Sequence, residues 1–406
     1  MKKLNFIIKY GLALLLLSFY SCESWLNVTP SDRLSEEMLF NDREGFVKAL
    51  NGVYIELNTN ELYGRNLTAG ALDVMGQYYS VASSSHAFYN YGGLVYTGND
   101  EKALFDNMWQ KCYAVIACCN TIIEKCDENK AGLSPVWKGS IKGEALALRA
   151  MLHFDMLRLF GPLTSELDKE SIPYQTNSDQ TVTPLLSGSE VIGLILDDLK
   201  NAVGLLKDTD PYFVEEEFSD TDLNYRRFRM NYFAAKGLMA RVQLWGGDKE
   251  KAAITAKEVI AEGQAEGAEF FPFVTNSEAT SSNPDRVFYS EVLFGTYHSS
   301  REKLHEDLFA PTLESTSILT LAGTARRDDL YDNENDYRYS VWSTYNKNGT
   351  SVLYHRKFEK QDNVTASRQY MIPLIRMSEM YLIAVECCKL GEASVYLNTF
   401  RNARKW

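Results

Sequence analysis

The sequence predicts a mostly α-helical protein in which paired helices carry an irregular, loop-rich region. Apolar residues recur at helical spacing in several parts of the chain. Two long stretches, 81–98 and about 267–372, lack this periodicity, but their aromatic content argues against disorder. The second contains short β-like runs at 287–289 and 292–294. The 406 residues are 45% apolar and 24% charged, which is typical of a globular chain that can bury a large core.

The first 21 residues have the pattern of a signal peptide. Three lysines precede an apolar run centred on 12–17 that ends at Ser21, and the segment contains no acidic residue. A helix needs about 20 apolar residues to span a bilayer, and this run is shorter. Cys22 follows directly, which resembles a bacterial lipoprotein signal and implies that Cys22 carries the lipid. We expect a mature chain over 22–406 that is held at a membrane by acyl chains such as palmitate alone.

The charge balance argues against nucleic acid as a partner. Without its first 21 residues the chain has 39 Lys and Arg side chains against 54 Asp and Glu. Such an acidic protein gains nothing from the release of phosphate counterions.

Six further cysteines are expected to be small buried hydrophobic residues. Cys112, Cys119 and Cys126 are spaced by seven on one helical face, where a disulfide is geometrically poor. Zinc is not expected, because no CxxC motif and no nearby pair of histidines accompanies them. The other three are Cys118, Cys387 and Cys388.

Two helical hairpins can be located along the chain. The first has helical spacing over 109–123 and 141–152, with a turn at 130–135. The second runs over 228–264 and breaks at 246–248, where two glycines precede an aspartate. Their length and their small residues resemble tetratricopeptide-type repeats, which stack hairpins into a curved array. Further helices are expected at 44–57, 190–206 and 376–390.

A series of short motifs extends over nearly the whole chain. In order they are Cys22 with Trp25, Leu26 and Pro30; 49–54; Trp109, Tyr113 and Asn120; Glu144 to Ala150; 159–161; 232–241 with Leu244; and 372–376 with Glu379, Tyr381, Glu386, Asn398 and Arg401.

In this order and spacing the chain resembles the SusD/RagB family of surface nutrient-binding lipoproteins of Bacteroidetes. The resemblance implies a single domain of four tetratricopeptide-like hairpins with an irregular, substrate-facing region. We expect a helical part over about 35–265, an irregular part over about 266–372 and a C-terminal helical block over about 373–406. Pro162 stands where the family usually continues into Val-Pro, and the final helical block is expected to be short or truncated.

Charged residues within these motifs are predicted to belong to the scaffold. They lie on otherwise apolar helices, where charges usually pair to fix how helices meet. These residues are Arg149, Lys236, Arg241, Arg376 and Glu379.

No catalytic constellation is recognisable. His305 and Glu306 begin a metalloprotease-like HExxH motif, but Phe309 replaces the second histidine. Nucleophile-elbow and phosphate-loop motifs are missing from the sequence. Neighbouring acids such as 197–198 and 328–329 point apart on a helix and are better interpreted as solvated. We therefore expect a protein that is not an enzyme.

A structural Ca²⁺ is the one cofactor left open. The segment 220–224 begins like an EF-hand loop, but Tyr225 replaces the turn glycine and Asn231 the bidentate glutamate. The segment 332–336 offers three carboxylates on one side of an extended chain.

Carbohydrate binding needs flat aromatic faces and polar side chains, and two regions supply them. The first extends from Tyr78 to Tyr96 and the second from Tyr297 to Tyr345. Trp109, Trp137 and Trp245 lie on amphipathic helices and are assigned to the core instead. The candidate ligand contacts are Tyr79, Tyr89, Tyr91, Tyr297, Trp342 and Tyr345.

The resemblance implies a lipid-anchored, surface-exposed outer-membrane protein that binds an oligosaccharide and caps a SusC-like TonB-dependent transporter. Two alternatives stay open. The same lid could take peptides, or the chain could be a tetratricopeptide-type scaffold lipoprotein with protein partners only.

Overall fold

The computed structural model describes residues 36–81, 83–179 and 181–405. The predicted signal segment, the anchor Cys22 and the motif residues Trp25, Leu26 and Pro30 lie outside these ranges.

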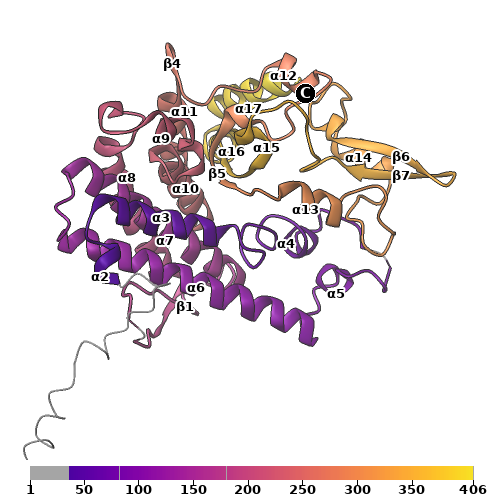
Figure 1. Cartoon of the computed structure of the whole chain (residues 1–406). Helices are drawn as coiled ribbons and strands as arrows, with labels where there is room; N and C mark the ends of the chain where they lie inside the picture. Colours follow the sequence, from indigo (N-terminus) through magenta and orange to yellow (C-terminus); the bar gives the residue numbers. More distant parts are fainter. Residues whose placement is uncertain (1–35, 82, 180, 406) are drawn as a thin grey trace, which may run out of the picture.

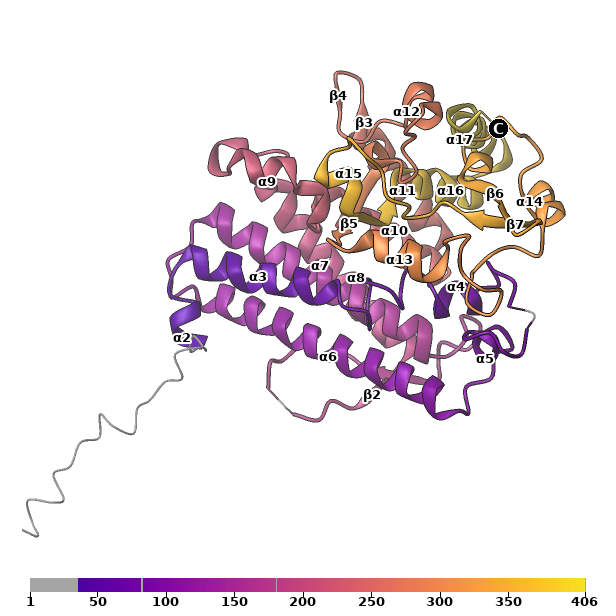
Figure 2. The ribbon, with the colours of Figure 1, turned by 45° about the vertical axis from the view of Figure 1, so that its right-hand side comes forward.

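A continuous array of helices forms the larger part of the molecule (Figure 1). Helix α3 packs against α6, which packs against α7, and α7 packs against α8. Helix α10 then joins α8 to α11, which leads to α16 and α17. Figure 2 shows α3, α6 and α7 running side by side. The helices are α3 (Arg43–Leu57), α6 (Asn99–Glu128), α7 (Pro135–Phe160), α8 (Gly188–Thr209), α10 (Tyr232–Trp245), α11 (Lys249–Gly263), α16 (Met377–Cys387) and α17 (Leu390–Arg404).

Both predicted hairpins are confirmed, and the residues at their ends show why the helices stop. Asn129, in the left-handed conformation, ends α6, and the Ser134 hydroxyl caps α7 by accepting the amide of Trp137. In the second hairpin Gly247 has a φ of 88°, and the Asp248 carboxylate caps α11.

Shorter elements connect and cover this array. The remaining helices are α2 (Glu36–Leu39), α4 (Ala71–Met75), α5 (Tyr89–Gly92), α9 (Asp220–Asn224), α12 (Asn276–Thr280), α13 (Arg301–Leu308), α14 (Thr324–Leu330) and α15 (Ala366–Tyr370), with 3-10 turns at Glu215–Glu217, Arg226–Phe228, Tyr289–Glu291 and Tyr339–Val341. Four antiparallel pairs join β1 (Glu170–Pro173) to β2 (Leu185–Ser187), β3 (Gln264–Ala265) to β4 (Ala268–Glu269), β5 (Val292–Tyr297) to β8 (Met371–Arg376), and β6 (Trp342–Lys347) to β7 (Thr350–His355).

Two details of the prediction are wrong. The apolar run at 287–289 is a turn and not a strand, because the Asp285 carboxylate accepts the amides of all three residues and Phe288 has a φ of 52°. The motif at 372–376 is strand β8, paired with β5, so the C-terminal helices begin at Met377 rather than near 373.

The main core lies within the helical array, and a second core lies under the irregular part. Leu50, Ile116, Leu148 and Phe233 are fully buried members of the first. The second joins residues from α4, α5, α13 and β8. Trp109, Trp137 and Trp245 pack against the main core, as predicted.

The cysteine prediction is confirmed for the helical face of α6. Cys112, Cys119 and Cys126 are buried, and burial raises the pKa of the Cys126 thiol to about 12. Cys118 is exposed and Cys387 and Cys388 are half-buried; these six are free thiols in the described part of the chain. Because Cys112, Cys119 and Cys126 are buried, they behave as small apolar residues.

The motif charges pair as predicted, with one exception. Arg149 donates two hydrogen bonds to Asp198, both at 2.7 Å. Asp198 is therefore buried and paired, and its interpretation as a solvated acid is wrong. Arg241 binds Glu379 in the same two-pronged way, at 2.6 and 2.7 Å. Lys236 pairs with Glu258 and Glu262. The exception is Arg376, whose backbone pairs with Val292 in the β5–β8 ladder but whose side chain forms neither a hydrogen bond nor an ion pair with the other described residues.

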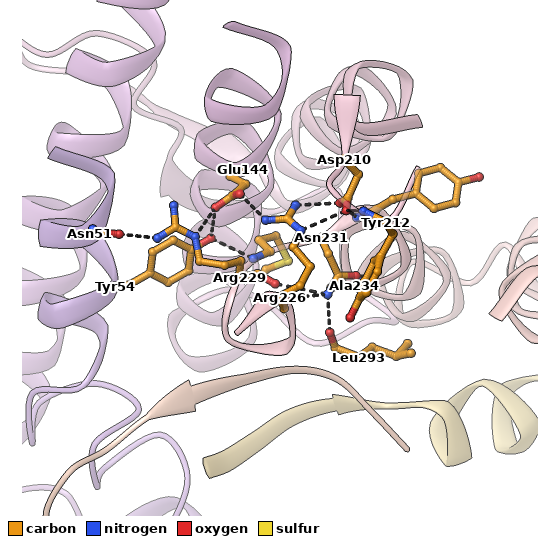
Figure 3. Close-up of polar contacts among 12 residues, drawn as sticks. Asn51, Tyr54, Glu144, Asp210, Tyr212, Arg226, Arg229, Asn231, Ala234 and Leu293 are labelled. Atoms are coloured by element: carbon orange, nitrogen blue, oxygen red, sulfur yellow. Dashed lines mark hydrogen bonds and ion pairs between the residues drawn. The ribbon is translucent and has the colours of Figure 1, made fainter. Parts of the chain in front are cut away.

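A second buried network fixes the turn before α10 to the helical array (Figure 3). Arg226 lies between Glu144 of α7 and Asp210, and its side chain is 3% exposed. The Glu144 carboxylate also accepts from Arg229 and from the Tyr54 hydroxyl of α3. These bonds hold the turn before α10 against α3 and α7.

Candidate functional site

The structure places the six predicted ligand-contact residues in different surroundings. Tyr89, Tyr297 and Tyr345 are 43%, 37% and 44% exposed, and Tyr79 is half-buried. Tyr91 and Trp342 are only 5% and 7% exposed. Tyr91 and Trp342 are therefore core residues. Tyr89, Tyr297 and Tyr345 instead expose ring surface that a ligand can contact.

The two aromatic regions predicted from the sequence meet in the fold. The Ser80 amide donates to the Thr320 carbonyl at 2.8 Å, and the Ala87 amide donates to Thr316 at 3.2 Å. His86 adds a buried ring contact to the Ile318 carbonyl at 3.2 Å. These three contacts hold the segment before α5 against residues 316–320. Helices α4 and α5 and the β6–β7 hairpin therefore lie on the same side of the molecule (Figures 1 and 2).

A groove of about 690 Å³ lies between the segment 313–324 and the β6–β7 hairpin, and we call it the hairpin groove. Apolar side chains such as Ile318 and Val352 alternate there with polar ones. Asn348, Lys347 and Glu314 add an amide and two charges to its wall. Six hydroxyl side chains line it: Ser315, Thr320, Thr324, Thr344, Thr350 and Ser351.

The floor of the groove rests on a small apolar cluster. Leu321 and Leu353 line the groove and pack with Trp342, and Tyr79 covers the same cluster. The Trp342 ring meets His355 edge-on at a centroid distance of 4.4 Å. Trp342 and Tyr79 thus support the groove from below.

Tyr345 lies beside the groove on strand β6. Its partner in the antiparallel ladder is Val352, which lines the groove. Since directly opposite residues share one face of a ladder, Tyr345 lies on the same face of the hairpin as Val352, and its ring is exposed.

The hairpin itself is a feature that the sequence interpretation missed. Asn348 and Gly349 both have positive φ, 52° and 87°, which is the conformation of a two-residue hairpin turn. An Asn-Gly pair between short β-like runs was the available signal. Lys347 fastens the hairpin by donating to the carbonyls of Thr312 and Leu313, both at 3.1 Å.

Tyr297 belongs to a separate aromatic patch at the end of β5. Its ring centroid is 5.3 Å from those of Phe228 and Tyr370, and 6.4 Å from that of Tyr225. The structure therefore does not bring Tyr297 together with Tyr345.

The segments considered for Ca²⁺ have other roles in the fold. The stretch Asp220–Asn224 is helix α9, and the Asp222 carboxylate accepts the Ser219 amide and hydroxyl at 3.0 and 2.7 Å. The buried Asp336 pairs with Arg338 at 2.6 Å. Within the described ranges, no group of three or more His, Cys, Asp or Glu side chains could hold a metal ion. Calcium dependence stays a prediction.

Residues 24–244 match the family model of SusD-like proteins, described as starch-binding and associating with the outer membrane. This match covers more than half of the chain, so the protein belongs to the SusD-like family.

Curated relatives and solved structures agree with this assignment. The chain is 26% identical over 265 residues to SusD-like protein P2 of Formosa agariphila, which covers 64% of this chain and 46% of that protein. It is 30% identical over 146 residues to a SusD-like protein of Bacteroides ovatus, covering 35% and 23% of the two chains. The chain thus spans less than half the length of these relatives.

The fold matches SusD superfamily crystal structures. A SusD superfamily protein from Bacteroides thetaiotaomicron superposes with a TM-score of 0.70 at 21% identity, covering 89% of this chain and 80% of that one. A SusD-like carbohydrate-binding protein from Bacteroides vulgatus gives 0.69 at 21% identity, covering 90% and 75%. A laminarin-binding SusD-like protein gives 0.62 at 16% identity, covering 89% and 84%. These likenesses confirm the predicted tetratricopeptide-like SusD fold. In the part of the chain that the structure describes, no helix combines the length and apolarity needed to cross a bilayer.

Proposed function

We propose that this protein binds oligosaccharides at the cell surface and delivers them to a SusC-like TonB-dependent outer-membrane transporter, without catalysing a reaction. The observation that carries the proposal is the hairpin groove in a chain of this family. The name of the laminarin-binding relative with the same fold supports a glycan as the ligand.

The chemistry of the groove suits a sugar. Sugar hydroxyls exchange hydrogen bonds with Ser, Thr and Asn side chains, and the C–H face of a pyranose packs on an aromatic ring. The groove supplies six hydroxyl side chains, and Tyr345 lies beside it with its ring exposed. Its volume of about 690 Å³ is within the range of small-ligand sites.

The remaining steps of the proposal concern location and partner. Cys22 would carry the lipid anchor, so that the domain stays at the membrane without a spanning helix. The helical array offers a broad rigid surface for docking onto a transporter, because stacked hairpins hold their shape over a long distance.

The test is a glycan array probed with the purified protein, followed by calorimetry on the best neutral oligosaccharide. We expect Tyr345→Ala to weaken binding, whereas Tyr297→Ala, in the separate patch, serves as the matched control. Binding that is lost in Tyr297→Ala and kept in Tyr345→Ala would move the site away from the groove. Binding of peptides but no glycan would contradict oligosaccharide as the cargo.

Two further readouts test delivery and the lack of catalysis. A tagged protein extracted from its native outer membrane in mild detergent is expected to co-purify with a large TonB-dependent barrel in near-equal amount. Chromatography of the bound oligosaccharide after long incubation is expected to show it uncleaved, and a cleavage product would contradict the proposal.

A further inference from the structure

A second cavity, of about 620 Å³, lies where the helical array meets the irregular part, and we call it the interface cavity. Helices α7, α10 and α16 and strand β8 contribute to its wall. Five cationic side chains but only two carboxylates line it. They are Arg158, Arg241, Arg286, Lys357 and Arg376, against Asp155 and Glu379.

Both carboxylates are already engaged. Asp155 accepts the Tyr63 hydroxyl at 2.6 Å and Arg158 at 3.1 Å. Glu379 accepts both of its hydrogen bonds from Arg241. Each carboxylate is thus already paired with one arginine of the wall, and neither bonds Arg286 or Arg376.

Arg286 is buried with most of its guanidinium unbonded. Its side chain is 8% exposed, and its Nε and Nη1 have no hydrogen-bond partner within the described residues. Only Nη2 approaches an acid, Glu359, at 3.2 Å, and Glu359 also binds Arg356 at 2.8 Å. Burial, and after it the charge of Arg356, lowers the pKa of Arg286. Buried donors without partners are rare, because each one is destabilising.

Arg376 is the second cation without a direct partner. Three acids lie in its surroundings and raise its pKa, but burial outweighs them and lowers it. Each acid is committed elsewhere: Glu291 to Arg404, Glu379 to Arg241, and Asp285 to backbone amides. Two guanidiniums in one cavity thus retain unused donors.

The rest of the wall suits a ring-shaped ligand. Tyr63, Phe154, Trp245 and Phe358 line the cavity with aromatic surface. A volume of about 620 Å³ is typical of a pocket that encloses a small organic molecule.

We infer that the interface cavity binds the oxyanion of an acidic saccharide, a carboxylate or a sulfate ester, through Arg286 and Arg376. Planar guanidiniums bind such groups with two parallel hydrogen bonds, and the aromatic wall accommodates the sugar ring. The inference rests on the proposed function in taking the bearer of the anion to be a sugar.

The test is calorimetry at low ionic strength with sodium glucuronate, glucose 6-sulfate, glucose and sodium sulfate. We expect the two acidic sugars to bind and glucose to bind at least tenfold more weakly. Arg286→Gln and Arg376→Gln should each reduce the affinity for glucuronate at least tenfold, because a charge-assisted hydrogen bond is lost. Lys303→Gln, which removes an exposed positive charge on α13, should leave it unchanged.

Several results would overturn the inference. Equal binding of glucose and glucuronate would show that the cavity does not recognise the anion. Binding of sodium sulfate as tight as that of glucose 6-sulfate would show that a free oxyanion, and not a saccharide, is the ligand. If Arg286→Gln does not fold, Arg286→Lys replaces it as the test variant. It keeps the positive charge but loses the planar guanidinium, so it should still weaken glucuronate binding. Unchanged glucuronate affinity in both Arg286→Lys and Arg376→Gln would contradict the proposal.

The two sites can be separated in the same experiments. Tyr345→Ala should weaken neutral oligosaccharides and leave glucuronate binding intact. Glucuronate binding without any neutral glycan binding would refute the hairpin groove as the glycan site and leave the cavity standing. The reverse result would refute only the cavity.

Discussion

The helical array and the irregular part differ in how fully their buried arginines are bonded. In the array Arg149 is paired with Asp198, and Arg226 with Glu144 and Asp210. In the irregular part Arg286 and Arg301 each keep a buried nitrogen without a hydrogen-bond partner among the described residues, although Glu291 there pairs with Arg404. The array thus uses its charges to fix its own geometry, whereas the irregular part retains donors that a ligand can use.

The first way to break this comparison is to remove a paired charge from the array, where we expect the largest effect. Arg226→Ala would leave Glu144 and Asp210 buried and uncompensated, which should lower the free energy of unfolding by about 3–5 kcal/mol. Urea denaturation measures it. The control is Lys251→Ala, whose exposed pair with Asp248 should contribute little to stability, because solvent and salt screen it. Equal stability of the two variants would contradict the contrast.

A pH titration probes the same scaffold through His153. The Gln175 amide donates to its Nε2 at 3.0 Å, so Nδ1 carries the proton and donates to the Arg149 carbonyl at 3.0 Å. Burial lowers the pKa of His153 to about 3, from an ordinary value of 6.5. Between these values the unfolded chain binds the proton and the folded protein does not. Stability should therefore fall as the pH drops from about 6.5 towards 3.

Chemical denaturation at pH 7 and at pH 4.5 measures this loss. His355, whose pKa burial also lowers to about 3, adds to it in the same direction. His153→Gln should make the difference between the two pH values smaller. An unchanged difference would show that His153 does not contribute.

A smaller effect, on ligand affinity, is expected when the exposed Tyr345 ring is removed. Tyr345→Ala should reduce the affinity for a neutral oligosaccharide about tenfold, by removing a stacking face of about 1–1.5 kcal/mol. Its melting temperature should stay at the wild-type value, because the ring is exposed. A variant that loses stability together with affinity would place Tyr345 in the scaffold instead.

The smallest change in stability is expected when an arginine with unbonded donors is removed from the irregular part. Arg286→Gln should leave the free energy of unfolding unchanged or raise it, since it removes a buried charge with unbonded donors. Thermal unfolding in buffer without sulfate or carboxylates measures it. A loss as large as that of Arg226→Ala would show that Arg286 is a structural residue.

The sequence predicted the array well because its helices carry periodic apolar faces and recurring motifs. Helix α7 extends beyond the predicted 141–152 to Pro135–Phe160, since it is buried on several sides and its apolar pattern is not confined to one face. The strand at 372–376 was missed because its pairing with β5 is a long-range contact.

The candidate site could be predicted only as two regions. The hydrogen bonds that join Ser80 to Thr320 link residues far apart in the chain, and no local pattern encodes them. Burial likewise separates Trp342 and Tyr91 from the exposed Tyr345 and Tyr89, although all four are aromatic residues in aromatic-rich segments. Residue type identified the regions, and packing decided which side chains reach the surface.

The central claim is that the irregular part binds the ligand and the helical array only supports it. Hydrogen–deuterium exchange with and without a bound neutral oligosaccharide tests it most directly, because it reports protection along the backbone. The account predicts slower exchange in 313–324 and in the β6–β7 hairpin, with α6 and α7 unchanged. Protection confined to α6, α7 or α8 would contradict it.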